Sequence, residues 1–243
     1  MALVLALVSS FITPSEARAQ DQFGGFQQFI DRGSLKPFAR DLGTVLGAAT
    51  FHSGRSLGFS GFDVGVRGGM TMSPDRDDRV LRGRGVNVFG LPWVQAEIGL
   101  PFSLDGFIRG GSFQGLTIAG GGLRYGLTKA SDKPYTPYFL VSWSAHSVAH
   151  TAFSASHFGV NLVTSMQAGP VSPYLGLGAD RTRVVVRAVP TLDPAMVGET
   201  ATALVPRATL GLSMRPKPYI YLHGAATYVN RGAGFDSGVG IRF

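Results

Sequence analysis

The chain has 243 residues and a formal net charge of +7, and it contains 34 glycines but no cysteine. The absence of cysteine excludes disulfide bonds, cysteine-ligated metal sites and thiol nucleophiles. Only 15% of the residues are charged and 44% are hydrophobic, which is little charge for a surface in contact with water. The basic residues are scattered singly rather than grouped in a block, so no nucleic-acid partner is expected.

Residues 1–19 have the pattern of a cleaved export signal. A short apolar core is followed by Ala17-Arg18-Ala19, the kind of small-residue pattern after which signal peptides are cut. A short membrane anchor is the alternative, but the core holds about 11 apolar residues where a spanning helix needs about 20. No later stretch reaches that length. If the protein lies in a membrane, strands must carry it across.

Residues 20–46 are predicted to form a short amphipathic helical segment. Phe23, Phe26 and Phe29 recur at helical spacing, and a second apolar group surrounds Pro37. The segment is expected at the periplasmic end of the protein, either as a plug in a barrel mouth or as helices on the membrane face. A further short strand at 44–53 is left open.

From residue 57 onward, apolar residues recur at every second position. Val94, Ala96 and Ile98, for example, share one face and polar residues separate them, as in a strand with one apolar face. About ten such segments can cross a bilayer, which takes about 9–11 residues of tilted strand. Residues 47–243 are therefore predicted to form an all-β fold, an antiparallel transmembrane β-barrel of about 10–12 strands. A soluble β-sandwich is the alternative.

One segment departs from this regular alternation. Between Tyr174 and Val189, Leu175 and Leu177 fall on one phase, whereas Val184 and Val186 fall on the other. A β-bulge inserts one residue into a strand and shifts the phase in this way. We therefore expect a bulge near Asp180.

The connections between segments differ in length, which sets the predicted orientation. Outer-membrane barrels have short periplasmic turns and longer external loops. The long loops at 73–86 and 188–202 are therefore expected outside the cell. The expected periplasmic turns are 103–106, 129–135, 169–173 and 215–218.

The last strand ends on an aromatic residue. Phe235, Val239, Ile241 and Phe243 share its apolar face. Such an ending resembles the closing strand of bacterial outer-membrane barrels, which the barrel-assembly machinery recognises, so Phe243 is predicted to be an assembly signal. Aromatic residues near other segment ends predict interfacial girdles, against the alternative that aromatics simply favour strands. These are Phe59, Trp93, Phe102, Phe107, Phe113, Tyr138, Phe153, Tyr174, Tyr219 and Tyr228.

Ionisable side chains recur on the polar faces of the predicted strands. Each Arg facing lipid at mid-depth would cost about 2–4 kcal/mol, so these side chains are predicted to line the lumen. They either pair there and fill it as a stabilising polar interior, or they line a wet path for solutes. The predicted lumen-lining residues are Asp63, Arg67, Glu97, Arg109, Arg124, His146, Arg207, His223, Asp236 and Arg242.

No motif in the chain supports catalysis or metal binding. The segment 144–150 is the best candidate, because it resembles the Ser–His elements of outer-membrane lipid hydrolases. However, His146 and Ser147 are neighbours on a strand and point to opposite faces, out of hydrogen-bond reach. His146 and His150 are roughly 13 Å apart at strand rise, too far for one metal ion. We therefore predict a protein that is not an enzyme and has no cofactor and no metal site.

Two glycine-rich stretches carry a family resemblance. They resemble bacterial outer-membrane β-barrels that are loosely similar to the long-chain fatty-acid transporter family, and the resemblance covers about residues 40–243. It implies an outer-membrane barrel that passes small or hydrophobic solutes. The stretches are Glu97-Ile98-Gly99-Leu100-Pro101-Phe102-Ser103-Leu104-Asp105-Gly106-Phe107-Ile108-Arg109-Gly110-Gly111 and Gly121-Gly122-Leu123-Arg124-Tyr125-Gly126-Leu127.

Two alternatives to solute passage are kept. One is a structural or surface-binding barrel whose lumen is filled by side chains, and the less favoured one is a lipid-modifying enzyme of the outer membrane. The expected partners are outer-membrane lipid and lipopolysaccharide, and the barrel-assembly machinery through the C-terminal strand. The protein is expected to be a monomer.

Overall fold

The computed structural model describes residues 21–128, 135–229 and 232–243. The predicted signal at 1–19 and most of the predicted turn at 129–135 lie outside the described residues.

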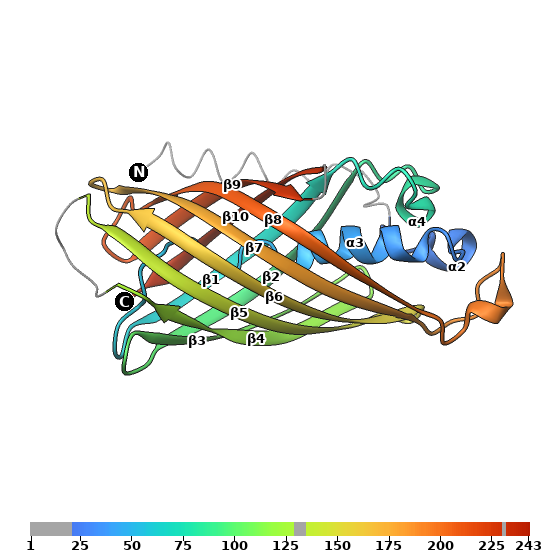
Figure 1. Cartoon of the computed structure of the whole chain (residues 1–243), viewed down its shortest axis with the longest axis horizontal. Coiled ribbons are helices and arrows are strands. Elements are labelled where there is room, and N and C mark those ends of the chain that lie inside the picture. The colour runs from blue at the N-terminus through green and yellow to red at the C-terminus, as the bar shows by residue number, and fades with distance from the viewer. Residues whose placement is uncertain (1–20, 129–134, 230–231) are drawn as a thin grey trace, which may run out of the picture.

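Ten antiparallel strands close into a single barrel (Figure 1). Each strand pairs with the next along the chain, and β1 pairs with β10 to complete the ring. The predicted antiparallel barrel is therefore confirmed, at the lower end of the predicted strand number. The strands are β1 (Phe62–Met72), β2 (Val88–Gly99), β3 (Leu104–Phe113), β4 (Leu116–Gly126), β5 (Pro137–Ala149), β6 (Phe153–Met166), β7 (Val171–Val186), β8 (Thr200–Met214), β9 (Ile220–Val229) and β10 (Gly232–Arg242).

The two ends of the barrel differ. The long connections 73–87 and 187–199 lie at one end, here called the loop end, and carry the short helices α4 (Arg79–Arg82) and η1 (Pro194–Met196). The opposite end, where β1 begins and β10 ends, is called the turn end. The connections 100–103 and 215–219 lie there.

The outer face of the barrel is an apolar belt. Leu162, Leu177 and Ala208 lie side by side on β6, β7 and β8, and both leucines are about half exposed. A closed barrel also leaves no free sheet edge, so its backbone groups need no water. An apolar belt around a closed antiparallel barrel is the architecture of outer-membrane proteins, in agreement with the location predicted from the sequence.

The N-terminal helices, α2 (Phe26–Phe29) and α3 (Leu35–Leu46), enter the barrel at the loop end (Figure 1). In α3, Leu35, Phe38, Leu42 and Val45 are all buried, and a proline at position 37 is tolerated because it lies in the first helical turn. The sequence predicted this segment at the end with the short turns, which is wrong. Among the described residues, no helix combines the length and the hydropathy that a bilayer span requires.

After α3, the chain crosses the lumen to the turn end. Gly47 lies against Arg207, the His52 ring stacks on Tyr221 with centroids 4.3 Å apart, and Leu57 reaches Asp105. Residues 47–61 contain no strand, so the strand considered at 44–53 is wrong. The physical reason is the point of entry: a chain that enters at the loop end must traverse the barrel before β1 can begin.

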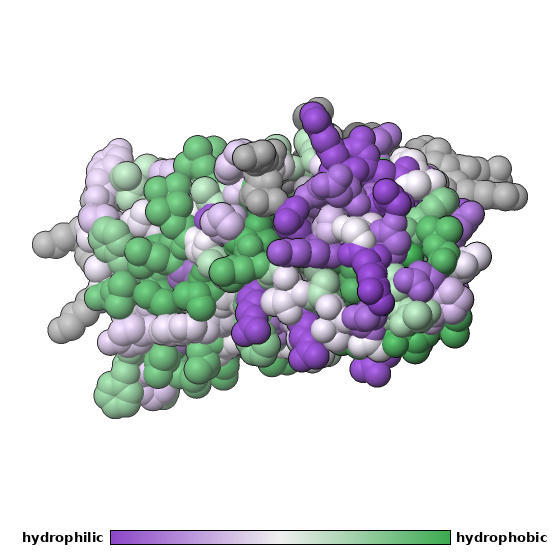
Figure 2. All heavy atoms as spheres, turned by 45° about the vertical axis from the view of Figure 1, so that its right-hand side comes forward, coloured by the Kyte–Doolittle hydropathy of each residue, from purple (hydrophilic) through white to green (hydrophobic). Residues whose placement is uncertain are grey.

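The polarity of the wall is reversed at the loop end. Inside it, Phe26, Phe38 and Phe153 form an aromatic cluster, with centroids 4.7–5.1 Å apart. Outside it, Arg181 and Arg183 are exposed. Figure 2 brings this end forward and shows hydrophilic side chains gathered in a broad patch beside hydrophobic surface. The loop end therefore has an apolar core and a polar exterior, like a soluble domain.

This reversal explains the irregular segment of β7. Its register is continuous with β6 from Phe153–Val186 to Ser165–Tyr174, and it is also continuous with β8. The predicted bulge near Asp180 is therefore wrong. Side chains keep alternating, but the inner face becomes apolar where Val184 packs into the loop-end core.

The girdle prediction is only partly correct. Phe102, Tyr219, Tyr228 and Phe243 are well exposed on the surface, as is Phe59. Side chains of another group are buried instead and face the interior, because they fill the space around the N-terminal segment. This group is Trp93, Phe107, Tyr138, Phe153 and Tyr174.

The depth of the belt along the barrel axis is testable with single arginines on β7 and β5. We expect Leu177→Arg, in the middle of the belt, to lower the free energy of unfolding in lipid vesicles by about 2–4 kcal/mol. Ala149→Arg adds the same side chain to an exposed position at the loop end and is expected to have an effect of less than about 1 kcal/mol. Urea unfolding followed by tryptophan fluorescence measures both. Equal losses would contradict this placement of the belt.

Candidate functional site

The predicted lumen-lining residues lie inside the barrel as one extended polar network. All are buried except Arg242, which is half-buried. They project from the inward phase of β1–β5 and β8–β10. Most of them contact one another or the N-terminal segment, whereas His146 has no hydrogen-bond partner among the described residues.

Arg67 of β1 is the centre of the network. Its Nη2 lies 3.2 Å from Asp63 Oδ1, 2.7 Å from Glu97 Oε1 and 3.0 Å from the Tyr221 hydroxyl oxygen. The Tyr221 hydroxyl in turn donates to Asp63 Oδ1 at 2.8 Å. Nη1 of Arg67 donates to the carbonyl oxygen of Ala49 at 3.3 Å. A fully buried guanidinium is thus neutralised by two carboxylates and also holds residues 47–61, here called the luminal segment.

Glu97 of β2 links this centre to the turn end. Its second carboxylate oxygen pairs with Arg124 of β4, and Arg124 also lies 3.6 Å from Asp105 of β3. Asp105 accepts a hydrogen bond from the backbone N–H of Leu57 at 2.9 Å. Buried charges are stable only when they are paired and hydrogen-bonded, and here each has such partners.

The C-terminal end of α3 is held by two wall arginines. Arg207 donates to the carbonyl oxygen of Thr44 at 2.7 Å, and its Nε donates to Asp180 at 2.7 Å. Arg109 donates to the carbonyl oxygen of Leu46 at 3.0 Å. The last carbonyls of a helix have no partner within the helix and carry partial negative charge. The two guanidinium groups donate hydrogen bonds to these carbonyls inside the barrel, where water does not supply donors.

The close approach of α3 to the wall depends on two glycines. A side chain at Gly43 would overlap Thr182 of β7, and one at Gly47 would overlap Arg207 and Asp180. Glycine at these positions lets the backbone come within hydrogen-bond reach of the arginines.

The segment after α3 is bound along its length. The Ala49 N–H donates to Asp236 of β10 at 3.1 Å, and Arg242 donates to the carbonyl oxygen of Ser56 at 3.1 Å. These contacts replace the ladder hydrogen bonds that the segment lacks. The protein's own chain therefore crosses the lumen and is held by the wall at both ends of this segment.

The inner face of β5 and β6 differs from the rest of the wall. Ser142, Ser144, His146 and Asn161 are buried there with side-chain polar atoms that have no partner among the described residues. His223 of β9, by contrast, lies 3.4 Å from the Tyr174 hydroxyl through Nδ1. His146 faces inward and the neighbouring Ser147 is exposed outside, so the two do not form a catalytic pair.

Sequence reasoning missed several members of the network. Gln95, His157 and Asp180 share the inward phase of their strands, so strict alternation would have found them. Asp105 was assigned to a turn, although β3 begins at Leu104. His52 lies in the luminal segment, where no strand period marks it. Among the described residues, no cluster of three or more His, Asp or Glu side chains is suited to a metal ion.

A carboxyl pair joins α3 to the loop that carries α4. Asp41 accepts a hydrogen bond from the Asp75 N–H at 2.8 Å, and Asp78 caps α4 through the Leu81 N–H at 3.1 Å. Burial, together with the charge of Asp78, raises the pKa of Asp41 to about 8. Burial also raises the pKa of Asp78 to about 6. Arg40 pairs with Asp75 beside them.

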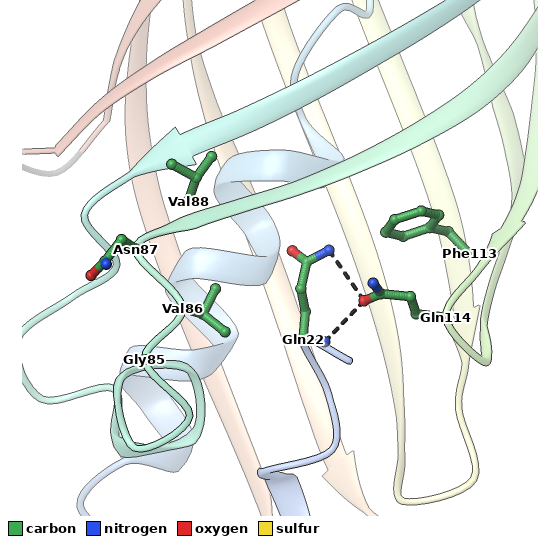
Figure 3. A pocket seen from close by; sticks show the side chains of 7 residues that line it. All are labelled: Gln22, Gly85, Val86, Asn87, Val88, Phe113 and Gln114. Carbon is green, nitrogen blue, oxygen red and sulfur yellow. Dashed lines mark hydrogen bonds between the residues drawn. The ribbon is translucent and has the colours of Figure 1, made fainter. Parts of the chain in front are cut away.

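A recess of about 420 Å³ opens at the loop end, between the N-terminal segment, the 85–88 loop and the β3–β4 turn (Figure 3). The Gln22 backbone N–H and Nε2 both donate to Gln114 Oε1, at 2.9 and 3.2 Å. Gln22 Oε1 accepts from the Gly90 N–H at 3.0 Å. Strands β2 and β3 pair only from Gly99–Asp105 to Val94–Gly110, so Gln22 bridges the wall where they separate.

Comparison with known proteins gives a likeness of architecture. No family model and no curated protein sequence matches the chain. Solved structures that resemble it include Ail of Yersinia pestis (11% identity, TM-score 0.39, 76% of this chain and 99% of that one). The N-terminal barrel of Pseudomonas aeruginosa OprF (10%, 0.38, 76% and 99%) and Neisserial surface protein A (14%, 0.33, 75% and 94%) are others. These low values concern the barrel fold, and no residue role transfers from them.

The anchor of α3 can be tested by breaking one ion pair. We expect Arg207→Met to lower the free energy of unfolding by about 3–5 kcal/mol, because it leaves the Asp180 carboxylate buried without its cation. The double variant Arg207→Met with Asp180→Asn is expected to recover part of this loss. Urea unfolding in vesicles measures the cycle. A loss below about 1 kcal/mol for Arg207→Met would show that the contact contributes no more than a surface pair.

The carboxyl groups of Asp41 and Asp78 predict that the contact between α3 and the loop that carries α4 depends on pH. A folded-state pKa raised above its ordinary value means that the neutral acid is favoured in the fold. The stabilisation from Asp41 and Asp78 is therefore complete below about pH 4 and is lost as pH rises through about 6 to 8. Hydrogen exchange of the α4 amides, corrected for its intrinsic pH dependence, should accelerate over that window. Asp41→Asn should flatten the profile, and an unchanged profile in this variant would contradict the assignment.

Proposed function

We propose that this protein is an outer-membrane barrel that is closed by its own N-terminal segment and acts as a structural or surface-binding barrel. The observation that carries this proposal is the binding of the α3 C-terminus by Arg109 and Arg207 inside the lumen. A segment held in this way belongs to the folded core of the molecule.

Energetics favour the closed state. Hydrogen bonds to charged groups contribute about 1.5–3 kcal/mol each, and the wall contributes several to the segment between Thr44 and Leu57. Withdrawing that segment would also leave wall guanidiniums without the acceptors that they now have. Spontaneous opening to a water-filled pore is therefore expected to be rare.

A surface-binding role would be located at the loop end. Arg79 pairs with Asp31, and Arg40 pairs with Asp75, so the long 73–87 connection is fixed to the helical segment. The recess beside Gln22 adds a hollow lined by three amide side chains and the apolar Val86, Val88 and Phe113. A fixed surface with such a recess suits binding of a neutral polar ligand or a protein.

Solute passage is the second candidate. The observation that favours it is the set of polar atoms without partners among the described residues on the inner face of β5 and β6. The sequence resemblance to fatty-acid transporters points the same way. A path along this face would bypass α3, which packs mainly against β7 and β8.

Partners of the closed barrel are proposed from its ends and its belt. Outer-membrane lipid would surround the apolar face of a monomer. The assembly machinery would bind the closing strand, where Phe243 is 67% exposed and its ring lies 5.4 Å from that of Tyr219. The Phe243 N–H donates to the Phe62 carbonyl oxygen at 2.8 Å, so the proposed signal also seals the barrel.

Conductance in planar bilayers separates the two functions. We expect the mature chain to give no stable open channel and Arg109→Ala with Arg207→Ala to give frequent openings, because the variant frees the C-terminus of α3. Asn161→Leu is the control on the β5–β6 face. If the mature chain conducts steadily and Asn161→Leu reduces that current, solute passage is the correct function.

A further inference from the structure

Two arginines of β7 face outward from the barrel. Arg181 and Arg183 are exposed, whereas the arginines of β1, β3, β4 and β8 are buried in the lumen. On a strand, positions two apart lie on the same face about 6.8 Å from each other. The two guanidinium groups therefore form an adjacent pair on the outside of the wall.

The pair lies at the boundary of the apolar belt. Leu175, Leu177 and Ala179 occupy the preceding outward positions of β7 and are exposed. Across the sheet, Arg181 is opposite Phe158 and Leu204, and Arg183 is opposite Ser156 and Thr202. Apolar neighbours thus give way to hydroxyl side chains between the two arginines. A change from apolar to hydroxyl side chains on the outer face is expected where lipid tails end and headgroups begin.

Neither arginine has an acidic partner among the described residues. No ion pair among the described residues joins Arg181 or Arg183 to a carboxylate, whereas Arg40 of α3 and Arg79 of α4 are paired. A third cation, Arg187, lies farther along the same side and donates from Nε to Ser154 Oγ at 3.0 Å. The outer face of β6–β8 therefore carries a local excess of positive charge above the belt.

We propose that Arg181 and Arg183 bind the phosphate groups of lipids in the leaflet at the loop end. The guanidinium fork matches phosphate oxygens in geometry and charge, and the adjacent leucines provide the surface on which the acyl chains of the same molecule would lie. The proposal rests on the outer-membrane location of the barrel. The expected ligand is a membrane lipid, because the two arginines directly follow the exposed apolar residues of the belt on the outer face of β7.

The test is the affinity of the refolded mature chain, in detergent micelles, for lipid A that carries both phosphates, measured by native mass spectrometry. With roughly a fivefold contribution from each arginine near an anionic headgroup, Arg181→Gln with Arg183→Gln should bind about 25-fold more weakly. Lys36→Gln with Arg76→Gln is the matched control. It removes the same charge from exposed loop-end positions and should bind like the parent.

Three results would overturn the proposal. One is equal binding by the parent and the Arg181–Arg183 variant, and another is equal binding of lipid A without phosphates. The third is competition by millimolar inorganic phosphate, which would indicate a site for free phosphate. Heat-modifiable mobility on gels verifies that each variant is folded. Failure of the parent itself to insert into vesicles would contradict the membrane location, which distinguishes that failure from failure of the lipid site.

Discussion

The rest of this structure depends on the backbone carbonyls at the C-terminal end of α3, which have no hydrogen-bond partner within the helix. The C-terminus of α3 lies inside the barrel, and its last carbonyls need donors that water would otherwise supply. Arg109 and Arg207 supply them from opposite parts of the wall. Those cations in turn need Asp180 and the neighbouring polar network to be stable in the interior. The position of α3 and the charged side chains of the lumen therefore depend on each other.

A second consequence is that the barrel has two zones along its axis. Near the turn end, the exterior is apolar and the interior is polar, as a membrane requires. Near the loop end, Phe38 and Phe153 form an apolar interior and Arg183 faces outward, as in a soluble domain. A strand such as β7 passes through both zones without a break in register. Its side chains continue to alternate between the two faces of the wall, and only the polarity of each face changes.

This change of chemistry explains what the sequence could and could not predict. The period of two predicted the strands, their antiparallel closure and the inward direction of Arg67 or Glu97, because each choice follows from local alternation. Alternation does not show where along the barrel axis a residue lies. The change to apolar inner positions in β7 therefore led to the wrong prediction of a bulge. Alternation also says nothing of chain direction through the lumen, so α3 was placed at the wrong end. His52 belongs to a segment without regular structure, whose place only long-range contacts determine.

The width of the barrel gives a reason for the plug itself. Eight strands enclose a space that side chains alone can fill, whereas 16 or more leave an open channel. Ten strands enclose more than inward side chains occupy, and a helix is about 10 Å across with its side chains. Without α3 and the segment that follows it, the charged wall would face water, and ion pairs such as Arg67 with Glu97 would be screened. With the segment in place, the same ion pairs are buried. Arg67 also holds the segment that closes the barrel, through its hydrogen bond to the Ala49 carbonyl oxygen.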